Sequence, residues 1–153
     1  KILLDTTYLL PVFGVGIRLE EFSELFPRLL ERHEVLYSPL SLVEAKWVIL
    51  SLARRDPGRK GAYLSAYRLG LKALLADGRL KQTQLTSPAI EEIADALLEA
   101  GLRDYFDRMI YATAAVTDSI LLTEDQELAE AAKILPWKPK EVASWSDVAS
   151  GQL

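Results

Sequence analysis

Four acidic residues of this sequence are placed where a metal site could form. They are Asp5, Glu44, Asp107 and Asp125, and each lies where a strand-like apolar run meets a helix or in the first turn of a helix. Parallel strands end, and the following helices begin, at one edge of an α/β sheet, so carboxylates from distant segments can converge there. Converging carboxylates repel one another unless a cation joins them, and oxygen ligands suit a hard divalent ion. The pattern therefore predicts a divalent metal site that is open to a phosphate group.

Three further side chains could support this site. Asp104 stands three residues before Asp107, so both lie on one helix face, where one could be a direct ligand and the other could hold water. Thr6 and Thr123 adjoin candidate ligands, and their hydroxyls could orient carboxylates or metal-bound waters. As alternatives, the two hydroxyls could serve a turn and a helix N-cap.

Each acid also has a purely structural role open to it. Residues 41–44 and 123–126 both fit a capping box, and Asp104 and Asp107 could cap a helix and oppose its dipole. Asp5 is different, because an unpaired carboxylate at the end of a buried strand is costly without a cation or hydrogen-bond donors. Capping does not require the acids to meet at one edge, so the whole set favours the metal site.

Alternating strand and helix signals must position these side chains. Strands are predicted at residues 2–5, 35–38, 82–85 and 119–123, with a short edge strand in the tail after residue 135. Helices are predicted at residues 19–32, 41–52, 63–75, 88–98, 103–117 and 124–132. This alternation predicts a single α/β domain over residues 1–153 that is built on a parallel sheet.

The composition excludes several kinds of catalytic and metal site. The chain has no cysteine and one histidine, so thiolate nucleophiles, zinc-thiolate sites and histidine-based metal sites are excluded. No apolar run approaches the roughly 20 residues of a membrane span, and the first residues look like a strand rather than a signal peptide. We therefore expect a cytoplasmic protein that does not associate with membranes.

A basic stretch stands out from an otherwise acidic chain. Residues 54–81 contain eight basic and two acidic residues, a net charge of +6 within a chain of net charge −4. Arg54, Arg55, Arg59 and Lys60 are its densest part and could contact a phosphate backbone. The alternative is an ordinary solvated helix surface.

Taken together, the motifs resemble the PIN domain family. The resemblance rests on D-T-T-Y-L-L at 5–10, S-L-V-E-A at 41–45, D-R-M-I-Y-A-T-A from Asp107 and L-L-T-E-D at 121–125, in this order. It implies a three-layer α/β/α sandwich around a parallel sheet of about five strands. It also implies a Mg²⁺- or Mn²⁺-dependent ribonuclease, as in the toxins of VapBC toxin-antitoxin modules. The acidic quartet would be Asp5, Glu44, Asp107 and Asp125, with Asp104 an accessory acid. Glu124 departs from the family pattern and leaves open whether it or Asp125 faces the metal.

The expected function is hydrolysis of RNA phosphodiester bonds by a metal-dependent endoribonuclease. Asp5, Glu44 and Asp107 would hold the metal, and Asp125 would bind a second ion or position the attacking water. The alternative is a non-catalytic PIN-like module that binds RNA or another protein. A phosphatase of the haloacid dehalogenase type is disfavoured, because Thr7 stands where that family has a second aspartate.

The predicted helices at residues 41–52 and 63–75 suggest a protein partner. They carry more apolar residues than one buried helical stripe needs, which predicts a homodimer, although core packing would also explain these residues. These residues are Leu42, Trp47, Ile49, Tyr63 and Tyr67. If the protein is a toxin, we expect a small antitoxin as a second partner besides the RNA substrate.

Overall fold

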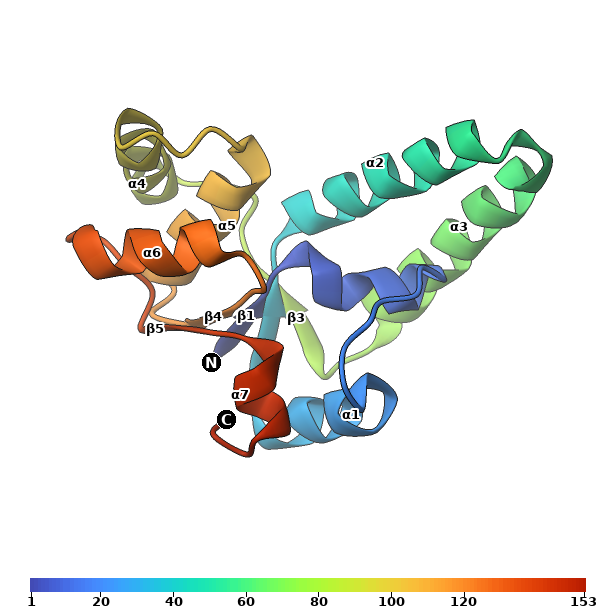
Figure 1. Ribbon diagram of the computed structural model, residues 1–153, viewed down its shortest axis with the longest axis horizontal. Coiled ribbons are helices and arrows are strands. Elements are labelled where there is room, and N and C mark those ends of the chain that lie inside the picture. Colours follow the sequence, from blue (N-terminus) through green and yellow to red (C-terminus); the bar gives the residue numbers. More distant parts are fainter.

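Five short strands form one parallel sheet at the centre of the computed structural model, which describes residues 1–153 (Figure 1). The order across the sheet is β3-β2-β1-β4-β5. In chain order the strands are β1 (Ile2–Leu4), β2 (Val35–Tyr37), β3 (Leu80–Gln82), β4 (Ile120–Leu122) and β5 (Glu141–Ala143). Leu3 of β1 pairs with Leu36 on one side and Leu121 on the other. Since all strands run in the same direction, their carboxyl ends share one edge.

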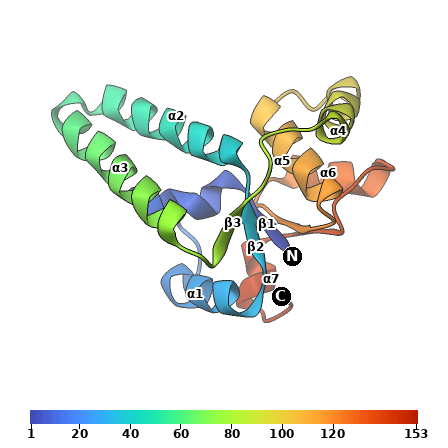
Figure 2. The ribbon, with the colours of Figure 1, turned by 180° about the vertical axis from the view of Figure 1, so that it is seen from behind.

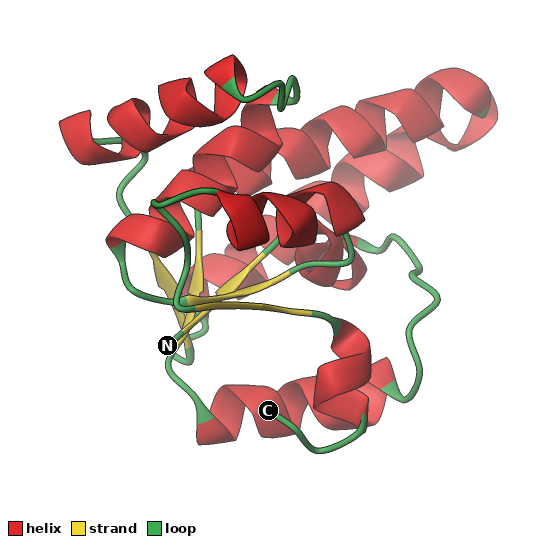
Figure 3. Cartoon of the chain, turned by 60° about the vertical axis from the view of Figure 1, so that its left-hand side comes forward, coloured by secondary structure: helices red, strands yellow, loops and turns green.

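Helices cover both faces of the sheet, which confirms the predicted three-layer sandwich (Figure 3). One face packs against η1 (Thr6–Phe13), α1 (Phe22–Arg32), α2 (Pro39–Arg55), α3 (Lys60–Ala76) and α7 (Trp145–Ala149). The other face packs against α4 (Pro88–Glu99), α5 (Tyr105–Val116) and α6 (Gln126–Ile134). The short η2 (Pro57–Arg59) joins α2 to α3 in a long hairpin that extends from the sheet (Figures 1 and 2). None of these helices is long and apolar enough to cross a membrane.

The sequence of β1 is apolar throughout because both of its faces are covered. Ile2 and Leu4 enter the core on the α2–α3 side, whereas Leu3 enters the core on the α5–α6 side. All three residues are fully buried. A parallel strand between two helical layers has no solvent-facing positions, so its residues do not alternate in polarity.

The structure differs from the sequence predictions most clearly in three elements. β3 spans Leu80–Gln82 instead of 82–85, and only Leu80 of this edge strand is buried, so the segment carries almost no apolar pattern. Residues 6–13 form a 3₁₀ helix where no helix is predicted. The short α7 is also unpredicted, and it depends on a capping box between Ser144 and Asp147.

Two of the five residues predicted to form a dimer interface are buried within the chain. Ile49 is 0% exposed and Tyr67 is 8% exposed, and both belong to the core between the hairpin and the sheet. The Tyr67 hydroxyl donates a hydrogen bond to the Leu42 carbonyl oxygen at 2.7 Å. Leu42 and Tyr63 pack partly against the same core, which leaves Trp47 as the exposed member of the set. Core packing, the alternative explanation, therefore accounts for most of this apolar surface.

Gly70 allows η1 to approach α3 closely, and this approach leads to a stability prediction. A Cβ atom at Gly70 would lie 2.3 Å from the Val12 carbonyl oxygen and 2.9 Å from the Phe13 ring. We expect Gly70→Ala to lower the free energy of unfolding by about 1–3 kcal/mol, since backbone must shift to make room. Gly61→Ala is the matched control on the same helix, because a Cβ there meets nothing within 4 Å. Urea denaturation of both variants checks the prediction, and equal midpoints would contradict it.

Candidate metal centre

Asp5 lies at the carboxyl end of β1, in the middle of the sheet. Its carboxylate accepts hydrogen bonds from the Thr6 backbone N–H at 2.7 Å and from the Thr123 hydroxyl at 2.6 Å. The residue is 8% exposed. Burial raises the pKa of Asp5, and repulsion from Asp125 and Asp104 adds to the rise, whereas the hydrogen bonds from Thr123 and Thr6 oppose it. The two hydrogen bonds therefore hold the Asp5 carboxylate in one orientation, whereas burial and the neighbouring acids disfavour its negative charge.

Glu44 reaches the same region from the second turn of α2. The helix begins after Ser38, whose hydroxyl accepts a hydrogen bond from the Leu40 N–H, with Pro39 at the first helical position. This start directs the Ser41 side chain into the interior, where it accepts a hydrogen bond from the Thr6 hydroxyl at 3.0 Å. Burial raises the pKa of Glu44, and the charges of Asp5 and Asp104 contribute to the rise. Glu44 and Asp5 line the same pocket.

Asp104 and Asp107 enter from the start of α5. Asp104 is the N-cap of this helix and accepts a hydrogen bond from the Asp107 N–H at 2.9 Å. One carboxylate oxygen from each of Glu44, Asp104 and Asp107 can be chosen such that all three atoms lie within 4.8 Å of one another. That spacing is compatible with shared coordination of a single ion, because oxygen ligands of Mg²⁺ or Ca²⁺ lie about 2.0–2.6 Å from it.

Asp125 completes the group from the start of α6. Its Oδ1 accepts a hydrogen bond from the Glu127 N–H at 2.8 Å, and its own N–H donates to the Thr123 hydroxyl at 3.1 Å. Burial raises the pKa of Asp107 to about 8, with repulsion from Asp104 and Asp5 and a hydrogen bond to Asp125 contributing. Capping and cation binding are thus compatible, because Asp104 and Asp125 each use Oδ1 for the cap and keep a second oxygen.

Glu124 makes contacts of a different kind. Its Oε2 accepts hydrogen bonds from the Tyr8 hydroxyl at 2.6 Å and from the Trp145 backbone N–H at 2.9 Å. The carboxylate therefore fastens η1 to the first turn of α7. These contacts favour Asp125 over Glu124 as the residue that faces a cation.

A pocket of about 260 Å³ brings the predicted quartet together at the carboxyl edge of the sheet. It is lined by Asp5, Glu44, Asp107 and Asp125, together with Thr6 and Glu124. Asp104 lines an adjoining groove that shares Glu44 with this pocket. The sequence indicated a capping role for Ser41, not its hydrogen bond with Thr6, and a dimer interface for Trp47, not a place in the groove, and it did not single out Phe106. The only sequence signal for these aromatic residues is their spacing of two or three from Glu44 and Asp104.

The family model for the PIN domain matches residues 2–134. The chain belongs to the PIN domain family. The match includes all five acids, whereas β5 and α7 of this PIN domain lie beyond the matched residues. No curated protein sequence matches the chain.

Two solved structures resemble this PIN domain in fold. VapBC2 from Rickettsia felis, bound to a DNA fragment from its promoter, shares 16% identity at a TM-score of 0.63, covering 94% of this chain and 98% of that chain. A toxin-antitoxin complex from Klebsiella pneumoniae shares 20% identity at a TM-score of 0.55, covering 93% of this chain and 100% of that chain. At sequence identities this low, the similarity shows a shared fold and does not show a shared activity.

The four basic residues predicted to contact RNA lie at the far end of the α2–α3 hairpin. Arg54, Arg55, Arg59 and Lys60 are all exposed. At 1.5 Å per helical residue, Arg54 stands about 15 Å along α2 from Glu44. The PIN domain therefore keeps these cations apart from the acidic centre, although Arg54 and Lys60 line the groove that leads to it.

Proposed function

We propose that this PIN domain is a metal-dependent endoribonuclease and that it acts as the toxin of a VapBC-type module. The observation that carries the proposal is the convergence of Glu44, Asp104 and Asp107, whose carboxylate oxygens lie within 4.8 Å of one another beside the buried Asp5. Burial raises the pKa values of Asp5, Glu44 and Asp107, and a folded protein has little reason to gather such carboxylates unless they serve a ligand. The best ligand for such a group is a cation.

The residues fit Mg²⁺ or Mn²⁺ by their donor chemistry. All candidate ligands are carboxylates, and the nearby hydroxyls of Thr6 and Thr123 add further oxygen atoms but no nitrogen or sulfur. Glu44, Asp107 and Asp5 would hold the cation, with Asp104 at its exposed side. When bound, a divalent cation supplies Lewis acidity to a phosphoryl oxygen and lowers the pKa of water.

The side chains around that centre have separate tasks in the proposed hydrolysis. Thr123 and the Thr6 N–H fix the two oxygens of Asp5, so this carboxylate keeps its orientation as charge changes around it. Asp125 lies beside Asp107 and would position a water molecule for attack on the phosphorus. The chain offers no cysteine nucleophile, and the mechanism requires no covalent intermediate.

We also propose two protein partners. One similar structure is VapBC2 from Rickettsia felis and another is a toxin-antitoxin complex from Klebsiella pneumoniae, and from this likeness we infer a small antitoxin that covers the acidic centre of this chain. The homodimer would use exposed leucines of α3, where Leu69 is 68% and Leu75 is 57% exposed, in place of the buried Ile49 and Tyr67. Sedimentation velocity tests the dimer, and a monomer at micromolar concentration would contradict it.

Cleavage of RNA by the purified protein tests the proposed activity. A panel of single-stranded and structured RNAs is incubated with Mg²⁺, with Mn²⁺ or with EDTA. We expect internal cuts with either cation and none with EDTA, because the carboxylates alone cannot activate water or neutralise a phosphate. If a folded protein that binds Mn²⁺ cuts no RNA in the panel, the ribonuclease proposal fails for these RNAs and the non-catalytic module is favoured.

A further inference from the structure

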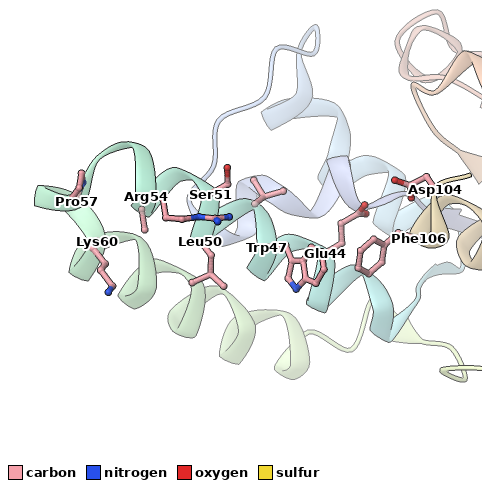
Figure 4. Close-up of a pocket in the computed structure, with 11 residues that line it drawn as sticks. Glu44, Trp47, Leu50, Ser51, Arg54, Pro57, Lys60, Asp104 and Phe106 are labelled. Carbon is pink, nitrogen blue, oxygen red and sulfur yellow. The ribbon is translucent and has the colours of Figure 1, made fainter.

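A groove of about 1060 Å³ connects the acidic centre to the basic tip of the hairpin. Glu44 and Asp104 line one end of it, and Arg54 and Lys60 line the other (Figure 4). The sign of the charge thus changes along the groove, from a site suited to a cation to a site suited to phosphate. An extended polyanion that is held by a cation at one end would meet compensating positive charge at the other.

Trp47 lies in this groove between its two ends. It stands three residues after Glu44 on α2 and is 63% exposed, more than Trp137 at 48% or Trp145 at 2%. Its ring contacts Phe106 nearly at right angles, at 78° and with 5.7 Å between the ring centroids. Figure 4 shows the two rings side by side, close to the carboxylates of Glu44 and Asp104. A perpendicular contact fixes the indole without covering both of its faces, and Trp47 belongs to none of the buried clusters of the core.

We propose that Trp47, braced by Phe106, is a stacking subsite for an unpaired base of single-stranded RNA. This inference deepens the proposed ribonuclease function and rests on it for the identity of the bound strand. One phosphate would lie at the acidic centre, a neighbouring base would stack on the indole, and further phosphates would reach Arg54 and Lys60. Every base has a flat π face, so such a subsite selects for unpaired strands and tolerates different sequences.

The charges favour RNA over an apolar protein segment as the occupant. A peptide could cover Trp47 and Leu50, but it would gain little from two cations at the far end of the groove. A double helix could contact the same cations with its phosphates, but its bases remain stacked on one another and would not reach the indole. The combination of a cation site, an exposed aromatic face and basic side chains matches the single strand alone.

The experiment measures RNA binding separately from cleavage. Asp5→Asn serves as the parent, because it is expected to leave the RNA intact, and it is assayed with Mg²⁺ by fluorescence anisotropy. The probes are a fluorescein-labelled single-stranded RNA of mixed sequence and the same strand annealed to its complement. Trp47→Ala removes the ring, and Trp47→Phe keeps an aromatic face. Trp137→Ala is the matched control, since Trp137 is 48% exposed but lies in the α6–β5 connection.

We expect Trp47→Ala to weaken binding of the single strand about 10-fold or more, in line with the loss of one stacked base. Trp47→Phe should retain most of the affinity, and Trp137→Ala should retain all of it. Affinity for the duplex should not depend on residue 47. The parent should also show RNA-dependent quenching of tryptophan fluorescence that Trp47→Phe loses, which would assign the quenched emission to Trp47.

Two results would overturn the subsite. The first is that the parent does not bind the single strand, and the second is that Trp47→Ala binds it as tightly as the parent does. Either result would favour an apolar protein segment as the occupant of the groove. The nuclease proposal can fail separately. If the wild-type protein cuts no RNA while Trp47→Ala still weakens binding, the subsite stands, the ribonuclease proposal fails and the non-catalytic RNA-binding module is favoured.

Discussion

Asp5→Asn is expected to abolish metal-dependent RNA cleavage while the protein remains folded. Asp5 is buried in the middle of the acidic group, and its loss removes one negative charge and one candidate ligand. Changes beside a metal site commonly cost about 10–100-fold, so we expect a loss of at least about 100-fold for a direct ligand. Cleavage rates with saturating Mn²⁺ measure the effect. Asp95→Asn, an exposed acid on α4, is the matched control and should cut at the wild-type rate.

The same substitution should stabilise the metal-free protein at neutral pH. Burial raises the pKa of Asp5 above its usual value of 3.8, so ionisation is harder in the folded chain than in the unfolded chain. That penalty appears as pH rises above 3.8 and is absent at lower pH, where the carboxyl is protonated in both states. An asparagine can still accept from the Thr6 N–H, and the Thr123 hydroxyl can rotate to accept from its amide. A less stable Asp5→Asn variant at neutral pH in EDTA would contradict this reasoning.

The metal-free protein should lose stability as pH rises, and Mn²⁺ should restore it. The pKa of Asp107 is raised from 3.8 to about 8 by burial and by the neighbouring acids. Between these two values the unfolded chain releases a proton that the folded chain retains, so the free energy of unfolding falls with increasing pH. One such group gives a slope of at most about 1.4 kcal/mol per pH unit, and solvent screening reduces it.

A cation replaces these protons, so its effect should grow with pH. Mn²⁺ at about 100 times its dissociation constant stabilises the folded state by about 2.7 kcal/mol. At about pH 5 protons compete with the cation, and the gain in Tm should be smaller than at about pH 8. Thermal melts in EDTA and in Mn²⁺ at both pH values check the prediction, with Asp107→Asn as the variant that should flatten the pH dependence. A gain in Tm that is equal at both pH values would refute the link between these acids and the cation.

The sequence was sufficient to predict the central part of the fold and the grouping of the acids. Strands β1, β2 and β4 are covered by helices on both faces, so nearly all of their residues are buried and apolar. A continuous apolar run of this kind can be recognised in the sequence. The rule that parallel strands end at one edge then places Asp5 and Asp125 together, although 120 positions separate them. Asp104 and Asp107 follow from their spacing on one helix.

Other features depend on contacts that no local pattern records. β3 is an edge strand with one buried residue, so its boundaries leave little trace in the sequence. Glu124 meets Tyr8 and Trp145 across the molecule, and its task in holding α7 could not be inferred from its position beside Asp125. The burial of Ile49 and Tyr67 depends in the same way on the close packing of η1, α2 and α3.

Calorimetric titration of the protein with Mn²⁺ tests most directly whether the convergent acids form a metal centre. We expect saturable binding by the wild-type protein, a loss of affinity of at least about 10-fold in Glu44→Gln and Asp107→Asn, and no change in Asp95→Asn. Binding that is absent from the folded wild-type protein, or that is equally strong in all three variants, would contradict the metal centre and with it the proposed nuclease.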